Sequence, residues 1–526
     1  MAWVETVMRR IVVLALAALL CIGIAVVANY SKQQPGSNMV ETPATAATPL
    51  PKQPTAFGIN VFGPIYWSRE RAFMNLVAGA GWYSILNGWS DLDLKRLDRE
   101  GALPSLRPGE NVAVVLVRPP RSVREDVAIR CRYEGEGVVS GISTANPVAS
   151  PGRFDFTWHR ETEWTHLRIE ATNPANPIRH IDCREADADP KLLFDPAFVA
   201  SVKPYKVVRF MDWQQSNSNA AGNWAQRTLP SSTFQAGGQG VALEHMVALA
   251  NIAQVDPWFV IPWNADAVYV ENFARYVHDH LDPKRAVYLE TGNEIWNQAF
   301  PAGQQALAEG RKANLGKTDD QARMRRYAQR SVEVFKIWER VYAQEPKRLV
   351  RILSGQHAWI DPLRDALAFG DTAAHVDALS SAAYFGQTLL TEPEPADTKD
   401  LSPLFPKLTA SIDATMEAAR QYKQLADQHG LRYIVYEGGQ HATYSGKDPT
   451  LLARLNRDPR MGEAYRRYLA EWDSQYGDVL MLFHSTSPIG ATMAFGLAEY
   501  SGQPLAETPK RKAVLDAIAA VSRSPR

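Results

Sequence analysis

The sequence predicts an α/β protein in which a (β/α)8 TIM barrel carries an inserted antiparallel β-sandwich. Three observations favour this fold. From residue 195 to the C-terminus, short runs rich in β-branched and aromatic residues alternate with amphipathic segments, as strands and helices do in a parallel barrel. Between residues 83 and 189, short alternating runs separated by turn residues replace that pattern. The 526 residues suit a barrel of about 250 to 400 residues with additions.

Two segments precede the predicted barrel. Arg9 and Arg10 are followed by an uncharged apolar run at residues 11–28, so residues 1–30 are either a signal peptide or a membrane anchor. The arginines keep the N-terminus in the cytoplasm, and we therefore expect the remaining chain to be anchored on the periplasmic side of the inner membrane or secreted. Residues 31–54 are rich in Pro, Thr, Ala, Ser and Gln and predict a disordered linker.

The predicted barrel comprises residues 55–82 and 190–526. Its first βα unit is a strand at residues 57–61 and a helix at 68–80. The other strands are predicted at residues 206–210, 258–261, 285–290, 349–353, 376–382, 431–436 and 479–483. Helices are predicted at residues 243–253, 270–280, 324–342, 412–429 and 511–521. By this count Glu294 follows the fourth strand and Glu437 ends the seventh.

The predicted sandwich occupies residues 83–189, after the first βα unit. Its clearest strands are expected at residues 112–117, 127–133, 154–158 and 164–169. The sequence leaves open whether this insert binds carbohydrate or only braces the barrel. Cys131 and Cys183 are the two cysteines beyond the apolar segment, and in an oxidising compartment a disulfide between them is favoured over two buried thiols.

The composition bears on the class of partner. Lys plus Arg and Asp plus Glu number 57 each, so no overall field favours nucleic acid or an anionic surface. The chain contains 14 Trp and 19 Tyr, and aromatic faces are surfaces on which sugar rings stack, although most large aromatic residues in any protein lie in the core. The sequence has neither an HExxH zinc motif nor a GxSxG elbow, and we expect no metal or cofactor.

Two glutamates hold matching positions in the predicted barrel. Glu294 lies in the phrase Gly292-Asn293-Glu294-Ile295-Trp296-Asn297, and Glu437 lies in Tyr436-Glu437-Gly438-Gly439. Each comes directly after strand-forming residues, where the reacting groups of (β/α)8 enzymes are located. Cleavage of a glycosidic bond needs one carboxyl group that protonates the leaving oxygen and a second that attacks the anomeric carbon or activates water. The pair therefore indicates a glycosidase.

These motifs resemble those of clan A of the glycoside hydrolases, the retaining (β/α)8 enzymes. In that clan the acid/base glutamate follows an asparagine at the fourth strand, and the nucleophile glutamate ends the seventh. The stretch Glu290-Thr291-Gly292-Asn293-Glu294 looks especially like the strand-four motif of the arabinofuranosidase and xylosidase branches. The resemblance covers the barrel and implies that Glu294 is the acid/base and Glu437 the nucleophile.

The resemblance also implies the surroundings of the pair. Arg209, at the end of the second strand, would hold Glu437 in its ionised form. Asn293 would bind a sugar 2-hydroxyl, and Tyr384 would hydrogen-bond Glu437. Further candidates for sugar binding lie at strand ends or in the following loops: Trp296, Trp263, Trp213, Trp224, His357 and His484.

Two positions depart from the clan pattern. The third strand ends without the histidine that several families carry, and the eighth ends Phe483-His484 where a tryptophan is common. The sugar therefore stays open. We expect an exported retaining glycosidase acting on a β-linked poly- or oligosaccharide. The alternatives are a non-catalytic polysaccharide-binding barrel and an anchored scaffold that docks a partner through the insert.

Overall fold

The computed structural model describes residues 48–391, 393, 395 and 397–523. The predicted signal peptide or anchor, and most of the predicted linker, lie outside these residues. Within the described part of the chain, no helix combines the length and the apolar character that crossing a membrane requires.

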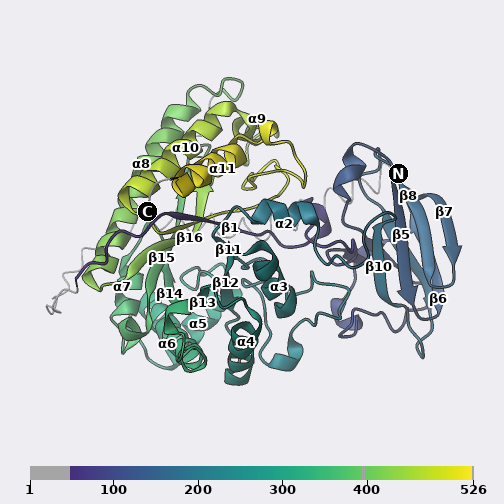
Figure 1. The fold of residues 1–526 in the computed structure, drawn as a ribbon, viewed down its shortest axis with the longest axis horizontal. Coiled ribbons are helices and arrows are strands. Elements are labelled where there is room, and N and C mark those ends of the chain that lie inside the picture. The colour runs from purple at the N-terminus through teal and green to yellow at the C-terminus, as the bar shows by residue number, and fades with distance from the viewer. Residues whose placement is uncertain (1–47, 392, 394, 396, 524–526) are drawn as a thin grey trace.

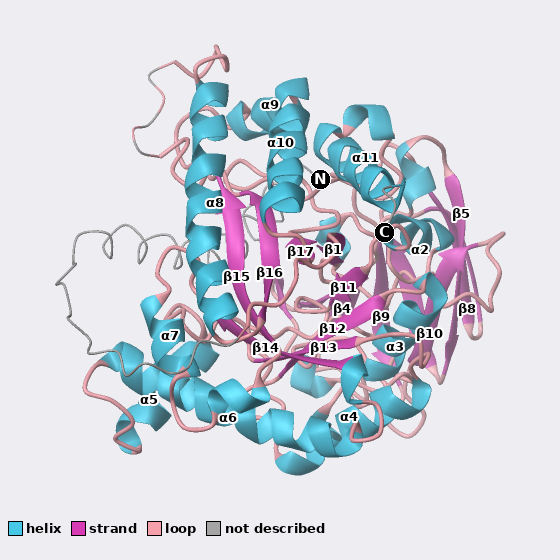
Figure 2. Ribbon diagram, turned by 60° about the vertical axis from the view of Figure 1, so that its left-hand side comes forward, coloured by secondary structure: helices cyan, strands magenta, loops and turns pink. Residues whose placement is uncertain are grey.

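Eight parallel strands close into a barrel in chain order, which confirms the predicted fold class (Figures 1 and 2). The strands are β1 (Ala56–Asn60), β11 (Val207–Arg209), β12 (Asp256–Ile261), β13 (Val287–Thr291), β14 (Leu349–Gly355), β15 (Ala378–Phe385), β16 (Arg432–Gln440) and β17 (Val479–Leu482). Each overlaps a strand predicted from an apolar run. The ring closes where β1 pairs with β17.

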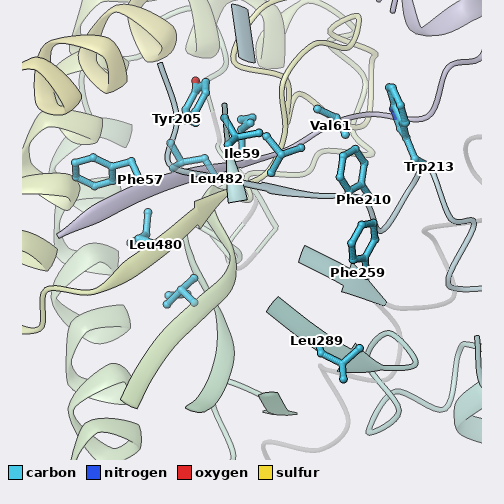
Figure 3. Packing of buried hydrophobic residues seen from close by; sticks show 14 of the residues in the cluster. Phe57, Ile59, Val61, Tyr205, Phe210, Trp213, Phe259, Leu289, Leu480 and Leu482 are labelled. Carbon is cyan, nitrogen blue, oxygen red and sulfur yellow. The ribbon is translucent and has the colours of Figure 1, made fainter. Parts of the chain in front are cut away.

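Helices surround the barrel (Figure 2). They are α2 (Pro196–Val202), α3 (Leu243–Ala253), α4 (Ala267–His280), α5 (Pro301–Lys312), α6 (Asp319–Val341), α7 (Asp361–Leu367), α8 (Leu404–Gln428), α9 (Leu451–Arg457), α10 (Pro459–Gln475) and α11 (Pro509–Arg523). Outward-facing strand residues such as Phe57, Leu289 and Leu480 join the core beneath these helices (Figure 3). This layer is the main core of the protein.

A second core fills the barrel interior. Trp258, Tyr288, Tyr436 and Met481 belong to it, each from a different strand. The interior is so closely filled that a Cβ atom added at Gly58 of β1 would lie 2.1 Å from the sulfur of Met481. Strand β1 therefore needs glycine at this point.

The predicted helix at residues 68–80 is wrong. A 3-10 turn, η1 (Tyr66–Ser68), is followed by an irregular segment in which Phe73 forms an isolated bridge with Phe194. The apolar residues of this segment serve two different cores: Phe73 packs into the barrel core, and Leu76 packs into the core of the insert. Their spacing resembled one helical face because two hydrophobic cores flank the segment. The helix between β1 and β11 is instead α2.

The insert consists of two antiparallel sheets beside the barrel (Figure 1). One contains β10, β5, β8 and β7, and the other contains β3, β2, β4, β9 and β6. Their bounds are β2 (Gly81–Ile85), β3 (Trp89–Asp91), β4 (Asn111–Val115), β5 (Val127–Glu134), β6 (Gly137–Ile142), β7 (Ala145–Ser150), β8 (Arg153–Trp158), β9 (His166–Thr172) and β10 (Arg179–Glu185). Residues of both sheets form one hydrophobic cluster, so the sheets pack as a sandwich.

Cys131 and Cys183 lie opposite each other on the paired strands β5 and β10. Their sulfur atoms form a disulfide, the bridge that the sequence favoured over two free thiols. Both residues are fully buried in the core of the sandwich. In chain order, β5 is the first strand of the four-stranded sheet and β10 is the last. The disulfide therefore links the two ends of the chain segment that forms this sheet.

Candidate active site

Glu294 lies in a tight turn three residues beyond the end of β13. Gly292 and Glu294 both have positive φ angles, of 62° and 44°. Positive φ is strained for a residue with a side chain, and such strain gathers at functional sites. The carboxylate of Glu294 accepts hydrogen bonds from the hydroxyl of Tyr436, at 3.0 Å, and from Nδ2 of Asn297, at 3.1 Å. The turn thus fixes the direction of this carboxyl group.

Glu437 reaches the site because β16 contains a bulge. Ser381 of β15 lies opposite Val435, and the next residue, Ala382, lies opposite Glu437, so Tyr436 is the extra residue. Side chains of a regular strand alternate between its two faces, and a bulge interrupts that alternation. Tyr436 and Glu437, although adjacent in sequence, therefore both point into the barrel, where Tyr436 belongs to the interior cluster.

Arg209, at the end of β11, connects the parts of the site. Its Nη1 donates to Glu437 at 2.7 Å and to Asn60 at 3.1 Å. Its Nη2 donates to Glu290 at 2.9 Å and to Asn293 at 2.7 Å, and its Nε donates to Glu290 at 3.2 Å. These bonds use all five N–H groups of the guanidinium, which is fully buried. One arginine thus joins β1, β11, β16 and the β13 strand and turn.

Glu290 is a buried carboxylate that the sequence analysis did not single out as a site residue. It accepts hydrogen bonds from Arg209, from the indole of Trp258 at 3.0 Å and from Ser354 at 2.8 Å. A carboxylate without solvent contact requires such partners. Glu290 was missed because the sequence does not show which face of a strand a single charged residue occupies, and this one points into the barrel toward Arg209 and Trp258.

Tyr384 and Asn293 make contacts that match their implied positions. The hydroxyl of Tyr384 donates to the second oxygen of Glu437 at 2.8 Å, so both oxygens of Glu437 have a donor. The side-chain oxygen of Asn293 accepts from Arg209, and its Nδ2 donates to Asn217 at 2.8 Å. One N–H of the Asn293 amide has no partner among these contacts.

The two glutamates have different electrostatic environments. Burial raises the pKa of Glu294, and the charge of Glu437 raises it further. Burial also raises the pKa of Glu437, but Arg209 and Tyr384 oppose that rise by attraction and hydrogen bonding. Glu294 has no cation among its hydrogen-bond partners. The arrangement therefore favours a proton on Glu294 and a negative charge on Glu437.

A second pair of acids lies beside the first. Burial raises the pKa of Asp212, just after β11, to about 7, and the charge of Glu437 contributes to that rise. Burial likewise raises the pKa of Glu70 to about 7, while the hydroxyl of Ser485, 3.0 Å away, opposes the shift. Asp212 could have been found from its place at a strand end, whereas Glu70 follows no predicted strand.

The structure does not place all predicted residues in a position to bind sugar. Trp213 is fully buried, and its indole donates to the backbone oxygen of Phe62, so it is a core residue. Trp263 is also buried, with its indole directed to Glu309 at 3.4 Å. Trp224 packs against the ring of Tyr269, below the guanidinium of Arg227. Trp213 and Trp263 are therefore corrected from stacking platforms to packing residues, whereas Trp224 is only partly buried and its role stays a prediction.

The two predicted histidines also have structural partners. Both ring nitrogens of His357 are bonded, to Ser381 at 2.9 Å and to the backbone oxygen of Thr415 at 3.0 Å. His484 is buried and stacks on Phe62 with 4.4 Å between ring centres. Burial lowers the pKa of both rings, which are therefore neutral at pH 7. Trp296 alone of the four tryptophans joins the network of the glutamates, because its indole donates to the hydroxyl of Tyr436.

Comparisons with known proteins add little. No protein-family model matches the sequence, and no curated protein matches it. Similar solved structures include an α-L-arabinofuranosidase from Thermotoga maritima, at 12% identity over 62% of this chain and 64% of that one, with a TM-score of 0.38. A family 51 α-L-arabinofuranosidase from Bifidobacterium longum matches at 11% identity over 63% of this chain and 68% of that one, with a TM-score of 0.39. A β-glucosidase from Thermotoga maritima matches at 10% identity over 62% of this chain and 86% of that one, with a TM-score of 0.36.

This chain spans less than two thirds of the length of the Thermotoga maritima arabinofuranosidase that it matches. TM-scores this low do not assign a function. What the barrel does must follow from its own side chains.

Proposed function

We propose that this protein is a retaining glycoside hydrolase with Glu294 as general acid and base and Glu437 as nucleophile. The observation that carries the proposal is that a buried carboxyl group, Glu437, and a partly buried one, Glu294, have opposite hydrogen-bonding environments. Glu437 accepts from Arg209 and Tyr384, whereas Glu294 accepts from the neutral donors Tyr436 and Asn297. An acid that keeps its proton next to a carboxylate that stays ionised is what hydrolysis of a glycoside needs.

The reaction would proceed in two displacements. Glu294 gives its proton to the glycosidic oxygen while a carboxylate oxygen of Glu437 attacks the anomeric carbon, so the leaving sugar departs as an alcohol and a glycosyl ester forms on Glu437. The ionised Glu294 then takes a proton from water, whose oxygen attacks the anomeric carbon and releases Glu437. Both groups return to their starting protonation states, and the anomeric configuration is retained.

The neighbouring residues support these steps. Arg209 and Tyr384 stabilise the negative charge of Glu437 before attack and after its release. The free N–H of Asn293 is proposed to donate to the 2-hydroxyl of the sugar, a bond that strengthens as positive charge develops at the anomeric carbon. No group of three or more potential metal ligands is present among the described residues, and no step in this scheme uses a metal.

The proposed substrate is a β-linked poly- or oligosaccharide outside the cytoplasm. The apolar segment at residues 11–28 supports export, as a cleaved signal or as an anchor in the inner membrane. The disulfide between Cys131 and Cys183 supports an oxidising compartment, because such bridges rarely persist in the cytosol. We therefore propose that the enzyme acts in the periplasm or after secretion.

Product analysis over a panel of defined polysaccharides tests the activity. Glu437→Gln should abolish release of reducing ends, while the exposed Glu417→Gln on α8 should leave it unchanged. Glu294→Ala should slow substrates with poor leaving groups far more than activated aryl glycosides, because only the former need the proton. NMR of the first-formed anomer reports retention. Turnover that survives Glu437→Gln, or an inverted product, would refute the mechanism, and binding without any product would leave a carbohydrate-binding barrel.

A further inference from the structure

The insert enters the chain at the face of the barrel that carries the two glutamates. Asn60 at the end of β1 bonds Arg209, and the residues that follow lead directly into the sandwich. The carboxyl ends of the barrel strands all meet at this face. The junction between barrel and insert therefore lies on the side of the molecule where substrate would enter.

The junction is unusually aromatic. Tyr66 of η1 packs with Tyr83 of β2 and with Ala113 and Val115 of β4 in one buried cluster. Trp67, Trp89 and Trp164 pack around that cluster but are only partly buried. Trp164 lies edge to face on Tyr66, with 5.3 Å between ring centres, and Trp89 lies 6.0 Å from the ring of Tyr83. We call Trp67, Trp89 and Trp164 the junction tryptophans.

The junction tryptophans differ from the tryptophans of the core. The indoles of Trp158, Trp213 and Trp258 each donate a hydrogen bond within the protein, and those of Trp82 and Trp338 are buried without a partner. Among the residues that the structure describes, none accepts a hydrogen bond from the indole of Trp67, Trp89 or Trp164, and none of these three nitrogens is buried. Buried indoles normally find a partner. Each junction tryptophan is partly exposed and has an indole N–H that is not buried, so ring surface and a donor are available to a ligand.

Ring contacts connect this region to the catalytic glutamates. Tyr384, which donates to Glu437, lies 6.1 Å from the ring of Phe483. His484 follows and stacks on Phe62, which lies 5.6 Å from the ring of Trp67. A series of ring contacts, which includes the buried His484, therefore joins Tyr384 beside Glu437 to Trp67.

The flanking charges limit the type of ligand. Arg69, two residues after Trp67, and Glu163, next to Trp164, form an ion pair. Arg118, close to that pair, and the exposed Asp91, opposite Tyr83, add one charge of each sign, so the charges around the junction balance. His166, beside Trp89, is buried, and burial lowers the pKa of its ring to about 4, so it is uncharged at neutral pH. Aromatic faces with free N–H donors and no excess charge suit the C–H faces and hydroxyl groups of uncharged sugars.

We propose that the junction tryptophans form a binding site for an uncharged polysaccharide chain that extends from the catalytic glutamates onto the insert. The proposal deepens the glycosidase function and rests on it for the class of ligand. It assigns the insert a role in recognising polymers, beyond support of the barrel.

Binding is tested in the full chain carrying Glu437→Gln, so that turnover does not interfere. Affinity gel electrophoresis with barley β-glucan, xyloglucan and galactomannan measures dissociation constants directly. Trp89→Leu keeps most of the apolar volume without an aromatic face, and Trp89→Phe keeps an aromatic face. We expect at least one polysaccharide to bind, Trp89→Leu to weaken it about tenfold and Trp89→Phe to recover most of that loss. Tyr276→Ala, on α4 outside the junction, is the control and should bind as the parent does.

A second measurement separates this site from the catalytic one. In the active chain, the ratio of kcat/KM on the bound polymer to kcat/KM on a short glycoside of the same sugar should fall about tenfold with Trp89→Leu or Trp67→Leu. Thermal unfolding checks that each variant folds. If Trp89→Leu does not fold, the result for Trp67→Leu decides the test. Unchanged affinity and ratio in a folded variant, or no binding of any of the three polysaccharides, would overturn the proposal. Binding that depends on Trp89 in a chain without hydrolytic activity would keep this site and refute the glycosidase function.

Discussion

Arg209 sets the charge balance of the site at the scale of single residues. Within the described part of the chain it is the one cation that contacts both Glu290 and Glu437, and its five N–H groups all have acceptors. A planar guanidinium can serve several acceptors at fixed angles, whereas a lysine ammonium offers three donors at a single point. The identity of this residue therefore matters beyond its charge.

Arg209→Lys should keep the positive charge and lose most of the geometry. We expect kcat/KM to fall by about 10² to 10³, because Glu437 loses its short charge-assisted bond. The free energy of unfolding should fall by about 1–3 kcal/mol, because buried acceptors are left without donors. Kinetics on the best polysaccharide and urea unfolding measure the two effects. Arg275→Lys, an exposed helix residue paired with Glu271, is the control, and equal behaviour of the two variants would contradict this role.

Tyr436 affects the acid directly. Its hydrogen bond to Glu294 stabilises the ionised form and so lowers a pKa that burial and Glu437 raise to about 8. A general acid must be protonated, so activity should be present below this pKa and lost as the pH rises through it. Tyr436→Phe removes the bond, and the alkaline limb of kcat/KM should therefore move to higher pH. A limb that stays in place or moves to lower pH would refute Glu294 as the acid.

Which site residues the sequence predicts depends on their place along a strand. Glu294, Glu437, Arg209 and Tyr384 all lie at or just beyond the ends of the predicted strands, and the motifs around the two glutamates resemble those of a known clan. Tyr436 was hidden because regular alternation would point it away from Glu437. Trp213 was misread because a strand-end position does not say whether the ring faces the mouth of the barrel or the helices.

At the scale of elements, register decides what the strands bring together. The bulge in β16 arises from pairing with β15, two strands joined through the 25-residue helix α8. Apolar runs of each strand predict that the strand exists, because every barrel strand is buried on both faces. They do not predict a one-residue offset between partners. The positions of strands were therefore predictable, and the bulge that places Glu437 was not.

The contact of β1 with β17 gives a test of interior packing. Gly58→Ala would bring a methyl group to 2.1 Å from the sulfur of Met481, so we expect a loss of about 1–3 kcal/mol in the free energy of unfolding. The same change in a Met481→Ala background should cost less, because the opposing side chain is gone. Gly238→Ala, where an added Cβ meets nothing within 4 Å, is the matched control. Urea midpoints measure all four variants, and strictly additive losses would exclude this contact as the cause.

At the scale of the whole molecule, two domains share one short segment of chain. Residues 69–80 supply side chains to the barrel core and to the core of the sandwich, and the cluster of Tyr66 and Tyr83 closes the junction. Glu70 is buried near this junction, and Asp212, in the barrel mouth, is partly buried with one carboxyl oxygen inaccessible. The stability of the entire chain is therefore linked to their protonation.

The sign of that linkage follows from the direction of the shifts. A carboxyl group with a raised pKa binds more protons in the folded chain than in the unfolded chain, so the free energy of unfolding falls as the pH rises between the two pKa values. For Asp212 this window runs from about 4, where the unfolded group titrates, to about 7. The partly buried histidines His357 and His441 have pKa values that desolvation lowers, so they act in the opposite direction below about pH 6.5.

Comparison of two chains isolates the contribution of one group. Asp212→Asn keeps the shape and removes the titration, while the histidines and other carboxyl groups are the same in both chains. We expect the free energy of unfolding of Asp212→Asn, relative to the parent, to rise between pH 4.5 and pH 8, by up to about 1.4 kcal/mol for each pH unit inside the window. Guanidinium unfolding at several pH values measures the difference. Glu417→Gln, at an exposed position, is the control and should show no such rise over this range. A difference between Asp212→Asn and the parent that does not change with pH would mean that folding does not raise the pKa of Asp212.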